Sequence, residues 1–196
     1  MLRAVFFDMD DTVLAPKGFN PWARFKESHG LPQGLLILDG IALQPHERRA
    51  ELLEALHRYE LEQIEASELR GGMAELLAEL RALGVATALL TNNHRRATEV
   101  ALRRHGLEFS LVLTRDEATP KPAPDLLLAA LGHFGLEAQQ ALYVGDSEGD
   151  LQACNAVGVP VWFLATPHNL QFSPRFEYTD HLREALLPRI VDRAGV

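Results

Sequence analysis

The sequence is poor in cysteine and in long apolar segments. Its one cysteine, Cys154, excludes an internal disulfide and fits a reducing compartment. No apolar stretch approaches the roughly 20 residues of a membrane-spanning helix. Charged residues, Arg3 and Asp8 among them, interrupt the N-terminal segment where the apolar core of a signal peptide would lie. These absences predict a cytoplasmic protein that has no membrane partner.

Positive charge is also scarce. The 196 residues include 27 acidic and 19 basic side chains, which gives a formal net charge of -8. No dense run of Lys and Arg is present that could follow a nucleic-acid backbone. The eight histidines contain no close pair with the spacing of a zinc site. We therefore expect neither nucleic acid nor zinc as a partner, and the composition leaves the oligomeric state open.

The chain contains a series of short apolar runs separated by helical patterns. Its length suits one domain, and a hydrophobic content of 47% can fill a sizeable core. Residues 73–83 and 151–157 carry apolar side chains at helical spacing, and glycine follows each segment. Strands that alternate with helices favour a doubly wound α/β fold with a parallel sheet. The predicted strands are residues 4–7, 85–90, 111–113, 141–144 and 159–164.

One segment breaks this alternation. Between residues 15 and 70 there is no convincing strand, but two stretches, around residues 19–28 and 46–64, have amphipathic helical patterns. The Gly/Pro-punctuated stretch LPQGLLILDG connects them. We therefore predict a small helical cap over residues 15–70, inserted into an α/β core made of residues 1–14 and 71–196.

Polar residues that follow the apolar runs form the candidate site. In open α/β sheets, ligands bind outside the carboxyl ends of the strands. Asp8 and Asp10, two positions apart after the first run, would point the same way in extended chain. The remaining candidates are Thr91 and Asn92 after the second run, Lys121 in the proline-rich segment TPKPAPD, and Asp146 and Asp150 in GDSEGD.

These side-chain types together suit phosphoryl transfer. Carboxylate oxygens are ligands for a hard cation, and Mg²⁺ takes a few carboxylates together with water and substrate phosphate. A lysine and a threonine hydroxyl can then hold the phosphate oxygens. Each piece alone has a plainer explanation, such as an acidic turn or a helix cap. Because all of them occur together, in this order and after successive strands, we predict a phosphoryl-transfer site.

Four short motifs, DMDDT, TNN, KPAPD and GDSEGD, carry a family resemblance. With them the chain resembles the haloacid dehalogenase superfamily of hydrolases, in particular its phosphoglycolate-phosphatase-like branch with a helical cap. The resemblance implies a Mg²⁺-dependent phosphatase for a small phosphorylated metabolite, such as phosphoglycolate or a sugar phosphate. It implies that Asp8 attacks phosphorus to form an aspartyl-phosphate, while Asp10 protonates the leaving oxygen and later activates water.

The resemblance also assigns the other candidates. Thr91, Asn92 and Lys121 would bind the phosphate. Asp8, Asp146 and the backbone carbonyl of Asp10 would be the metal ligands. Asp150 would lie just behind these ligands. The sequence departs from the family where relatives often carry glycine, because Asp11 stands there. This side chain either adds negative charge near the metal or faces solvent.

Other functions use similar residues. Receiver domains of signalling pathways also combine acidic metal ligands, a Thr or Ser, a Lys and a phosphorylated Asp, but their phosphorylated Asp follows the third strand. Here Asp8 follows the first strand and a second acid pair comes after Lys121, so the order favours the hydrolase. A haloacid dehalogenase is disfavoured because it would need neither Asp10 nor a metal. A sugar-phosphate mutase would keep both and stays an alternative.

Overall fold

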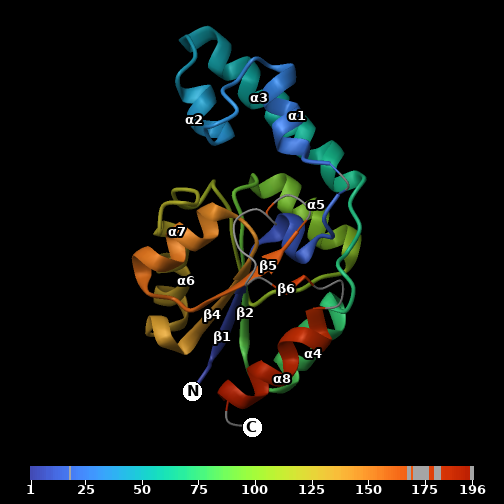
Figure 1. Ribbon diagram of the computed structural model, residues 1–196, viewed down its shortest axis with the longest axis vertical. Coiled ribbons are helices and arrows are strands. Elements are labelled where there is room, and N and C mark those ends of the chain that lie inside the picture. Colours follow the sequence, from blue (N-terminus) through green and yellow to red (C-terminus); the bar gives the residue numbers. More distant parts are fainter. Residues whose placement is uncertain (18, 167–168, 170–176, 179–181, 195–196) are drawn as a thin grey trace. The chain divides into compact units, whose positions relative to one another are not determined.

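The computed structural model describes residues 1–17, 19–166, 169, 177–178 and 182–194 (Figure 1). The other positions of the predicted cap and core, namely 18, 167–168, 170–176, 179–181 and 195–196, lie outside the described residues. Backbone contacts divide the chain into two compact units. We call Met1–Pro16 with Glu68–Val196 the core unit, and Lys17–Ser67 the helical unit.

The core unit contains a parallel sheet with the strand order β3-β2-β1-β4-β5-β6. The first five strands in the sequence confirm the predicted ones and, with their flanking helices, the doubly wound α/β fold. The sixth was not predicted, because two residues carry no alternation pattern. The strands are β1 (Ala4–Phe7), β2 (Ala86–Leu90), β3 (Leu111–Leu113), β4 (Ala141–Gly145), β5 (Val161–Ala165) and β6 (Glu177–Tyr178).

The first strand lies at the centre of the sheet. Every residue of β1 is buried, as expected for the run AVFF with helices over both faces. Phe7 pairs with Leu89 of β2 on one side and with Val144 of β4 on the other. The residues that follow β1, β2 and β4 therefore emerge at the same edge of the sheet. This register brings Asp8, Thr91 and Asp146 to a common level.

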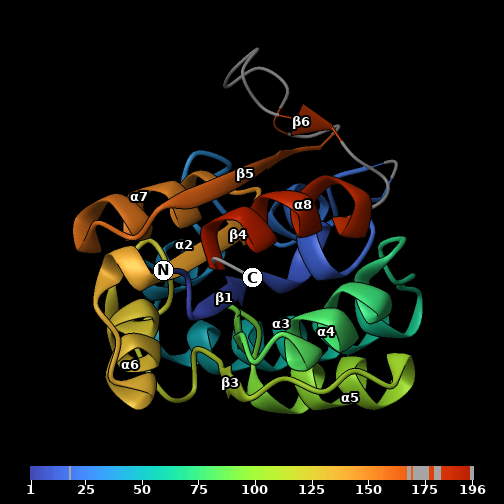
Figure 2. The same ribbon diagram turned by 90° about the horizontal axis from the view of Figure 1, so that it is seen from below.

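Helices cover both faces of the sheet (Figures 1 and 2). Helices α6 and α7 pack on one face, where their apolar side chains join those of β1, β2 and β4 in a single buried cluster. Figure 1 shows α4, α5 and α8 on the other side. Among the described residues, no helix has the length and apolar character needed to cross a membrane. The helices are α4 (Met73–Ala82), α5 (Arg95–His105), α6 (Asp125–Phe134), α7 (Glu148–Val157) and α8 (Leu182–Ala194), with the short turn η2 (Ala138–Gln140) before β4.

A single wide helical turn, η1 (Met9–Val13), comes after β1 and is closed by a bond from the N–H of Leu14 to the Met9 carbonyl at 2.9 Å. Asp11 has a φ of 54° within it, in the left-handed region that Asp tolerates better than most residues. The buried guanidinium of Arg70 donates to the turn, from Nε to the Thr12 carbonyl at 2.9 Å and from Nη2 to the Asp11 carbonyl. Arg70 thus stabilises a turn whose backbone departs from regular helix.

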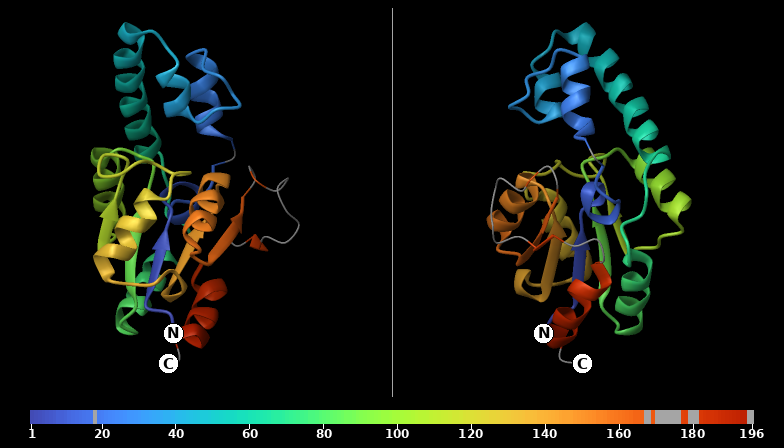
Figure 3. Two further views of the ribbon diagram at one scale, coloured as in Figure 1. Left: turned by 90° about the vertical axis from the view of Figure 1, so that its left-hand side faces the viewer. Right: turned by 45° about the vertical axis from the view of Figure 1, so that its right-hand side comes forward.

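The helical unit is built of helices (Figure 3), and its side chains form a hydrophobic core of their own. It contains α1 (Pro21–Ser28), α2 (Ile37–Ala42) and α3 (His46–Glu65). Asn20 caps α1 by accepting the N–H of Ala23 at 2.9 Å. Two predicted helical stretches correspond to α1 and α3, but the segment predicted as a connector contains α2, because its buried Ile41 packs into the local core. That core consists of Phe25, Leu31, Ile41, Leu52 and Leu56.

The segments that lead into and out of the helical unit pair with each other inside the core unit. Leu14 and Leu69 form an isolated antiparallel bridge. Next to it the N–H of Ala15 donates to the carbonyl of Glu68 at 2.9 Å. The chain therefore leaves the core unit and returns to it at one place, so the two connections begin side by side.

Candidate active site

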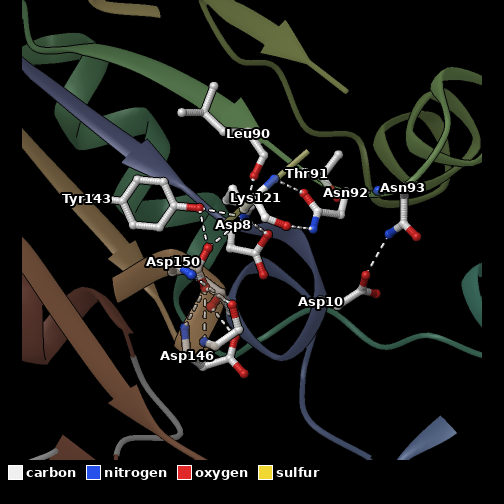
Figure 4. A network of polar contacts seen from close by, with 12 residues as sticks. Asp8, Asp10, Leu90, Thr91, Asn92, Asn93, Lys121, Tyr143, Asp146 and Asp150 are labelled. Carbon is white, nitrogen blue, oxygen red and sulfur yellow. Dashed lines mark hydrogen bonds and ion pairs between the residues drawn. The ribbon is translucent and has the colours of Figure 1, made fainter. Parts of the chain in front are cut away.

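The ammonium group of Lys121 lies at the centre of a buried polar network (Figure 4). Its Nζ is 2.5 Å from Asp8 Oδ1 and 2.7 Å from Asp150 Oδ1. It also donates to the Leu90 carbonyl at 2.9 Å and to the Tyr143 hydroxyl at 2.6 Å. The ends of β1, β2 and β4 and the start of α7 thus meet at one lysine, which the prolines of its own loop hold in place.

Asp150 uses both of its carboxylate oxygens within this network. Oδ1 accepts from Lys121 and, at 2.7 Å, from the Tyr143 hydroxyl. Oδ2 accepts from the backbone N–H of Ser147 at 2.9 Å and from its hydroxyl at 2.7 Å, in the capping box that begins α7. Asp150 therefore orients Lys121 and the turn that carries Asp146.

Gly145 makes room for this arrangement. A Cβ atom at this position would lie 2.6 Å from Asp150 Oδ2 and 2.7 Å from Tyr143 Cε1. Both distances are shorter than any ordinary contact, and Asp150 is completely buried. The end of β4 therefore needs glycine so that the carboxylate and the tyrosine ring can lie against its backbone.

Three carboxylates gather near the ammonium group. Asp8, Asp146 and Asp150 each offer an oxygen, and these oxygens lie within 4.8 Å of one another. The Thr12 hydroxyl holds Asp146 by donating to its Oδ1 at 2.8 Å. Three carboxylates and one ammonium leave a net negative charge, which a divalent cation would compensate. The oxygen-only ligands and their burial thus fit Mg²⁺.

The pKa values reflect this crowding. Burial, only partly offset by the charge of Lys121, raises the pKa of Asp8 to about 7. Burial and the charges of Asp8 and Asp150 raise the pKa of Asp146 well above its usual value. Burial opposes ionisation of Asp150 too, but the charge and hydrogen bond of Lys121 hold its pKa below the ordinary value. Asp150 is thus the permanent counter-ion of Lys121, while Asp8 and Asp146 favour a cation.

Asp10 points away from this cluster. Figure 4 shows its carboxylate directed toward Asn93, whose Nδ2 donates to Asp10 Oδ2 at 2.5 Å. The backbone N–H of Asn93 in turn donates to the hydroxyl oxygen of Thr91 at 3.1 Å. Since that hydroxyl accepts this bond, its own hydrogen can point at another acceptor. Asn93 therefore links the predicted acid and base to the predicted phosphate-binding threonine.

Asn92 engages the lysine loop through its side chain. Its Oδ1 accepts from the Lys121 N–H at 2.8 Å, and its Nδ2 donates to the Lys121 carbonyl at 2.7 Å. Both polar groups of the amide thus bind the backbone of the lysine. Asn92 positions Lys121 in this way, and its predicted contact with a phosphoryl group stays a prediction.

The structure adds four residues that the sequence did not single out as candidates. Tyr143 lies within an apolar run and resembles a packing residue. Asn93 reaches Asp10 only because of the turn after β2, which the sequence does not show. Arg70 and the buried Asn169 bind backbone carbonyls, and the Nδ2 of Asn169 donates to the Asp146 carbonyl at 2.7 Å. For Tyr143, Asn93 and Asn169 the sequence offered one signal, a polar group within or beside an apolar segment, and for Arg70 it offered none.

Comparison with known proteins identifies the family to which the chain belongs. Residues 37–164 match the family model described as haloacid dehalogenase-like hydrolase, a span that contains Thr91, Lys121 and Asp146. A haloacid dehalogenase-like hydrolase domain-containing protein of Arabidopsis thaliana is 29% identical over 164 residues, which are 78% of this chain and 66% of that protein. A phosphoglycolate phosphatase of Xanthomonas campestris is 29% identical over 180 residues, which are 81% of this chain and 80% of that enzyme.

A solved structure agrees with this assignment. The crystal structure of a HAD-superfamily hydrolase of subfamily IA from Geobacter sulfurreducens superposes with a TM-score of 0.65 and 27% sequence identity. The match covers 95% of this chain and 96% of the Geobacter chain. The chain therefore belongs to the haloacid dehalogenase-like hydrolase family, on its phosphoglycolate-phosphatase-like branch, and is a phosphatase-type hydrolase of that family.

Proposed function

We propose that the protein is a Mg²⁺-dependent phosphatase that hydrolyses small phosphomonoesters through an aspartyl-phosphate on Asp8. The observation that carries the proposal is the position of Lys121 Nζ, 2.5 Å from Asp8 Oδ1 and beside three buried carboxylates. A carboxylate that approaches a phosphate dianion needs positive charge close to both groups. The network supplies one such charge in Lys121 and a set of ligands for a second.

The first step is attack by an Asp8 oxygen on phosphorus, with expulsion of the substrate alcohol. Lys121 faces Asp8 and attracts the phosphoryl oxygens, and the Thr91 hydroxyl donates to them. Asp8 and Asp146, with the backbone carbonyl of Asp10, would hold Mg²⁺, which supplies charge neutralisation and polarises the phosphoryl group when bound. Asp150 keeps the ammonium group in place throughout.

Asp10 carries the proton in both halves of the reaction. It protonates the leaving oxygen as Asp8 attacks, and the carboxylate then takes a proton from the water that cleaves the aspartyl-phosphate. Its contact with Asn93 supports this role, because the amide holds Asp10 away from the carboxylate cluster. A carboxyl group outside that cluster can exchange protons with substrate without entering the cation site.

The helical unit is proposed to be the cap that selects the substrate. It has its own core and joins the core unit through a single pair of connections. Its residues can therefore change without altering the phosphate chemistry. We propose small phosphorylated metabolites, phosphoglycolate or a sugar phosphate, as substrates; the phosphatase named for phosphoglycolate among the relatives supports the first.

The decisive experiment measures hydrolysis of p-nitrophenyl phosphate with Mg²⁺, and again with excess EDTA. We expect activity only with Mg²⁺, and none above background for Asp8→Asn at unchanged circular dichroism. Asp192→Asn, on the exposed surface of α8, is the matched control and should behave as wild type. Full activity in EDTA, or wild-type turnover by Asp8→Asn, would refute the proposal. A panel of phosphorylated metabolites then identifies the substrate.

Two further outcomes would replace the hydrolase by another function. A sugar-phosphate mutase would convert a hexose phosphate into its isomer faster than it releases inorganic phosphate, which NMR of the products detects. A receiver-like switch would keep a phosphoryl group on Asp8 for hours without turnover, which mass spectrometry detects. Rapid release of inorganic phosphate excludes both.

A further inference from the structure

The hydroxyl of Tyr143 contacts both members of the buried ion pair between Lys121 and Asp150. It accepts from Lys121 Nζ at 2.6 Å and donates to Asp150 Oδ1 at 2.7 Å. The tyrosine side chain is completely buried in β4 (Figure 4). Its hydroxyl is therefore a fixed neutral group inside an ion pair.

The ammonium group of Lys121 has fewer hydrogens than neighbours. It carries three N–H bonds, whereas four acceptors surround it: Asp8 Oδ1, the Leu90 carbonyl, the Tyr143 hydroxyl and Asp150 Oδ1. Some of these contacts therefore share a hydrogen. A phosphoryl oxygen is a further acceptor, so one of the present acceptors has to release its share when a phosphate ester binds.

Among the three side chains that accept from Lys121, Tyr143 releases its share at the lowest cost. Its oxygen is neutral and a weaker acceptor than a carboxylate. Its own hydrogen stays on Asp150, so the hydroxyl and the carboxylate both keep a partner. Withdrawal of the ammonium from Asp8 or Asp150 would instead break a buried ion pair.

We propose that Tyr143 is a positioning residue for phosphate binding. In the free enzyme its hydroxyl helps to hold Lys121, and in the complex it releases one ammonium hydrogen to a phosphoryl oxygen while it keeps its bond to Asp150. No covalent bond changes in this exchange, and the protons stay on Lys121 and Tyr143. The inference rests on the proposed function, because it takes Lys121 as the ligand of the phosphoryl group.

The packing around the ring fixes the hydroxyl for this purpose. Gly145 brings the backbone of β4 against the ring, where an added Cβ would lie 2.7 Å from Tyr143 Cε1. Lys121 Nζ lies beyond the hydroxyl, 2.6 Å from the oxygen and 5.3 Å from the ring centroid (Figure 4). Tyr143 therefore cannot follow the ammonium toward the substrate, which makes release of the shared hydrogen the available response.

The test is Tyr143→Phe, which removes one oxygen atom, with Tyr59→Phe as the matched control. Tyr59 donates its hydroxyl to the Pro21 carbonyl inside the helical unit, at 2.9 Å. For Tyr143→Phe we expect both the KM for p-nitrophenyl phosphate and the inhibition constant of inorganic phosphate to fall about fivefold, because the bond that has to be released on binding is absent from the free variant. The Mg²⁺ concentration for half-maximal activity should stay unchanged. Tyr59→Phe should leave the phosphate inhibition constant and the Mg²⁺ requirement unchanged.

Other results overturn the inference. If Tyr143→Phe lowers the melting temperature but keeps the KM and the phosphate inhibition constant, the hydroxyl has only a structural role. If the Mg²⁺ requirement rises while phosphate inhibition is unchanged, the hydroxyl acts on the cation site instead. A wild-type protein without Mg²⁺-dependent phosphatase activity would refute the proposed function itself, which the same assay shows separately.

A second measurement uses the unmutated site in case Tyr143→Phe does not fold. The chain has three tyrosines, so 3-fluorotyrosine labelling gives three ¹⁹F resonances, which Tyr59→Phe and Tyr178→Phe assign by elimination. Addition of inorganic phosphate with Mg²⁺ should shift the Tyr143 resonance and leave that of Tyr59 in place. An unmoved Tyr143 resonance at saturating phosphate would contradict the proposed release of the hydrogen bond.

Discussion

The side-chain amide of Asn92 binds the backbone of Lys121 on both sides of its α-carbon, accepting its N–H at 2.8 Å and donating to its carbonyl at 2.7 Å. The proposed phosphate-binding lysine therefore depends on a residue that follows another strand. The asparagine directly after Thr91 thus has a structural task, which is to hold the lysine loop.

Asn92→Ala should weaken phosphate binding, because the lysine loop loses both bonds. We expect the KM for p-nitrophenyl phosphate to rise about tenfold and the free energy of unfolding to fall by about 1–3 kcal/mol. Steady-state kinetics and urea denaturation measure the two effects. Asn155→Ala, at an exposed position of α7, is the control and should change neither. An unchanged KM for Asn92→Ala would show that the loop holds Lys121 without the amide.

Asn93→Ala should impair proton transfer by Asp10, since the amide that orients this carboxylate is lost. The loss in kcat/KM should be about tenfold or more for an alkyl phosphate, whose leaving oxygen needs a proton. It should be smaller for p-nitrophenyl phosphate, whose leaving group departs without one. Equal losses for both substrates would mean that Asn93 acts on something other than the acid. Asn155→Ala again provides the control.

The raised pKa of Asp8 predicts how the metal-free protein responds to pH. The carboxyl binds its proton more tightly in the folded chain, with a pKa of about 7, than in the unfolded chain, where the value is 3.8. Its contribution to stability is therefore complete below pH 3.8 and is lost as the pH rises to about 7. Asp146 acts in the same direction. In EDTA the melting temperature should fall over this range, and saturating Mg²⁺ should restore it at pH 7.

Asp146→Asn isolates the charge repulsion behind that response. The amide oxygen can still accept from the Thr12 hydroxyl, but one like charge is gone. In EDTA at pH 8 we expect the variant to be more stable than wild type by about 1–2 kcal/mol. It should gain little from Mg²⁺ in the same thermal scan. If the variant is less stable than wild type in EDTA, repulsion does not dominate this cluster. Asp192→Asn serves as the control.

Arg70→Met should destabilise the turn that carries Asp10 and Asp11. The variant keeps most of the buried side-chain volume but loses the bonds to the Asp11 and Thr12 carbonyls. We expect a loss of about 2–4 kcal/mol in the free energy of unfolding. The Mg²⁺ requirement should also rise, because the Thr12 hydroxyl holds Asp146. Arg81→Met, which removes an exposed ion pair with Glu108, should cost below about 1 kcal/mol.

Replacement of residues 17–67 by a short Gly/Ser linker tests the proposed cap. The bridge between Leu14 and Leu69 keeps the ends of the segment together, so a short linker can close the gap. We expect the variant to fold, to keep Mg²⁺-dependent cleavage of p-nitrophenyl phosphate, and to discriminate less among small phosphates. A folded variant with the substrate ranking of the parent would make the segment a structural or oligomerisation element.

Most of the fold could be predicted because its strands are apolar on both faces. Short apolar runs such as AVFF that alternate with helical patterns indicate buried strands, and the register then places the end of β1 beside the end of β4. The sequence does not reveal α2, whose helix depends on packing of Ile41. It does not reveal the role of Tyr143 either, since a buried tyrosine in a strand is ordinarily a packing residue.

The sequence indicates which polar residues belong to the candidate site, but not which partner each of them binds. Asn92 and Asn93 are adjacent and chemically identical, yet one binds the backbone of Lys121 and the other the carboxylate of Asp10. Only the turn after β2 separates these roles. Arg70 gave no signal either, because its acceptors are backbone carbonyls, which every residue possesses.

The central strand β1 is synthesised first, but its neighbours in the sheet come much later. It pairs with β2, which begins at Ala86, and with β4, which begins at Ala141. During translation the helical unit can close its own core while the apolar strand still lacks both partners. Pairings this distant in sequence slow folding. The nascent chain should therefore need shielding of β1, and Lys121 meets its full set of partners only when α7 has been made.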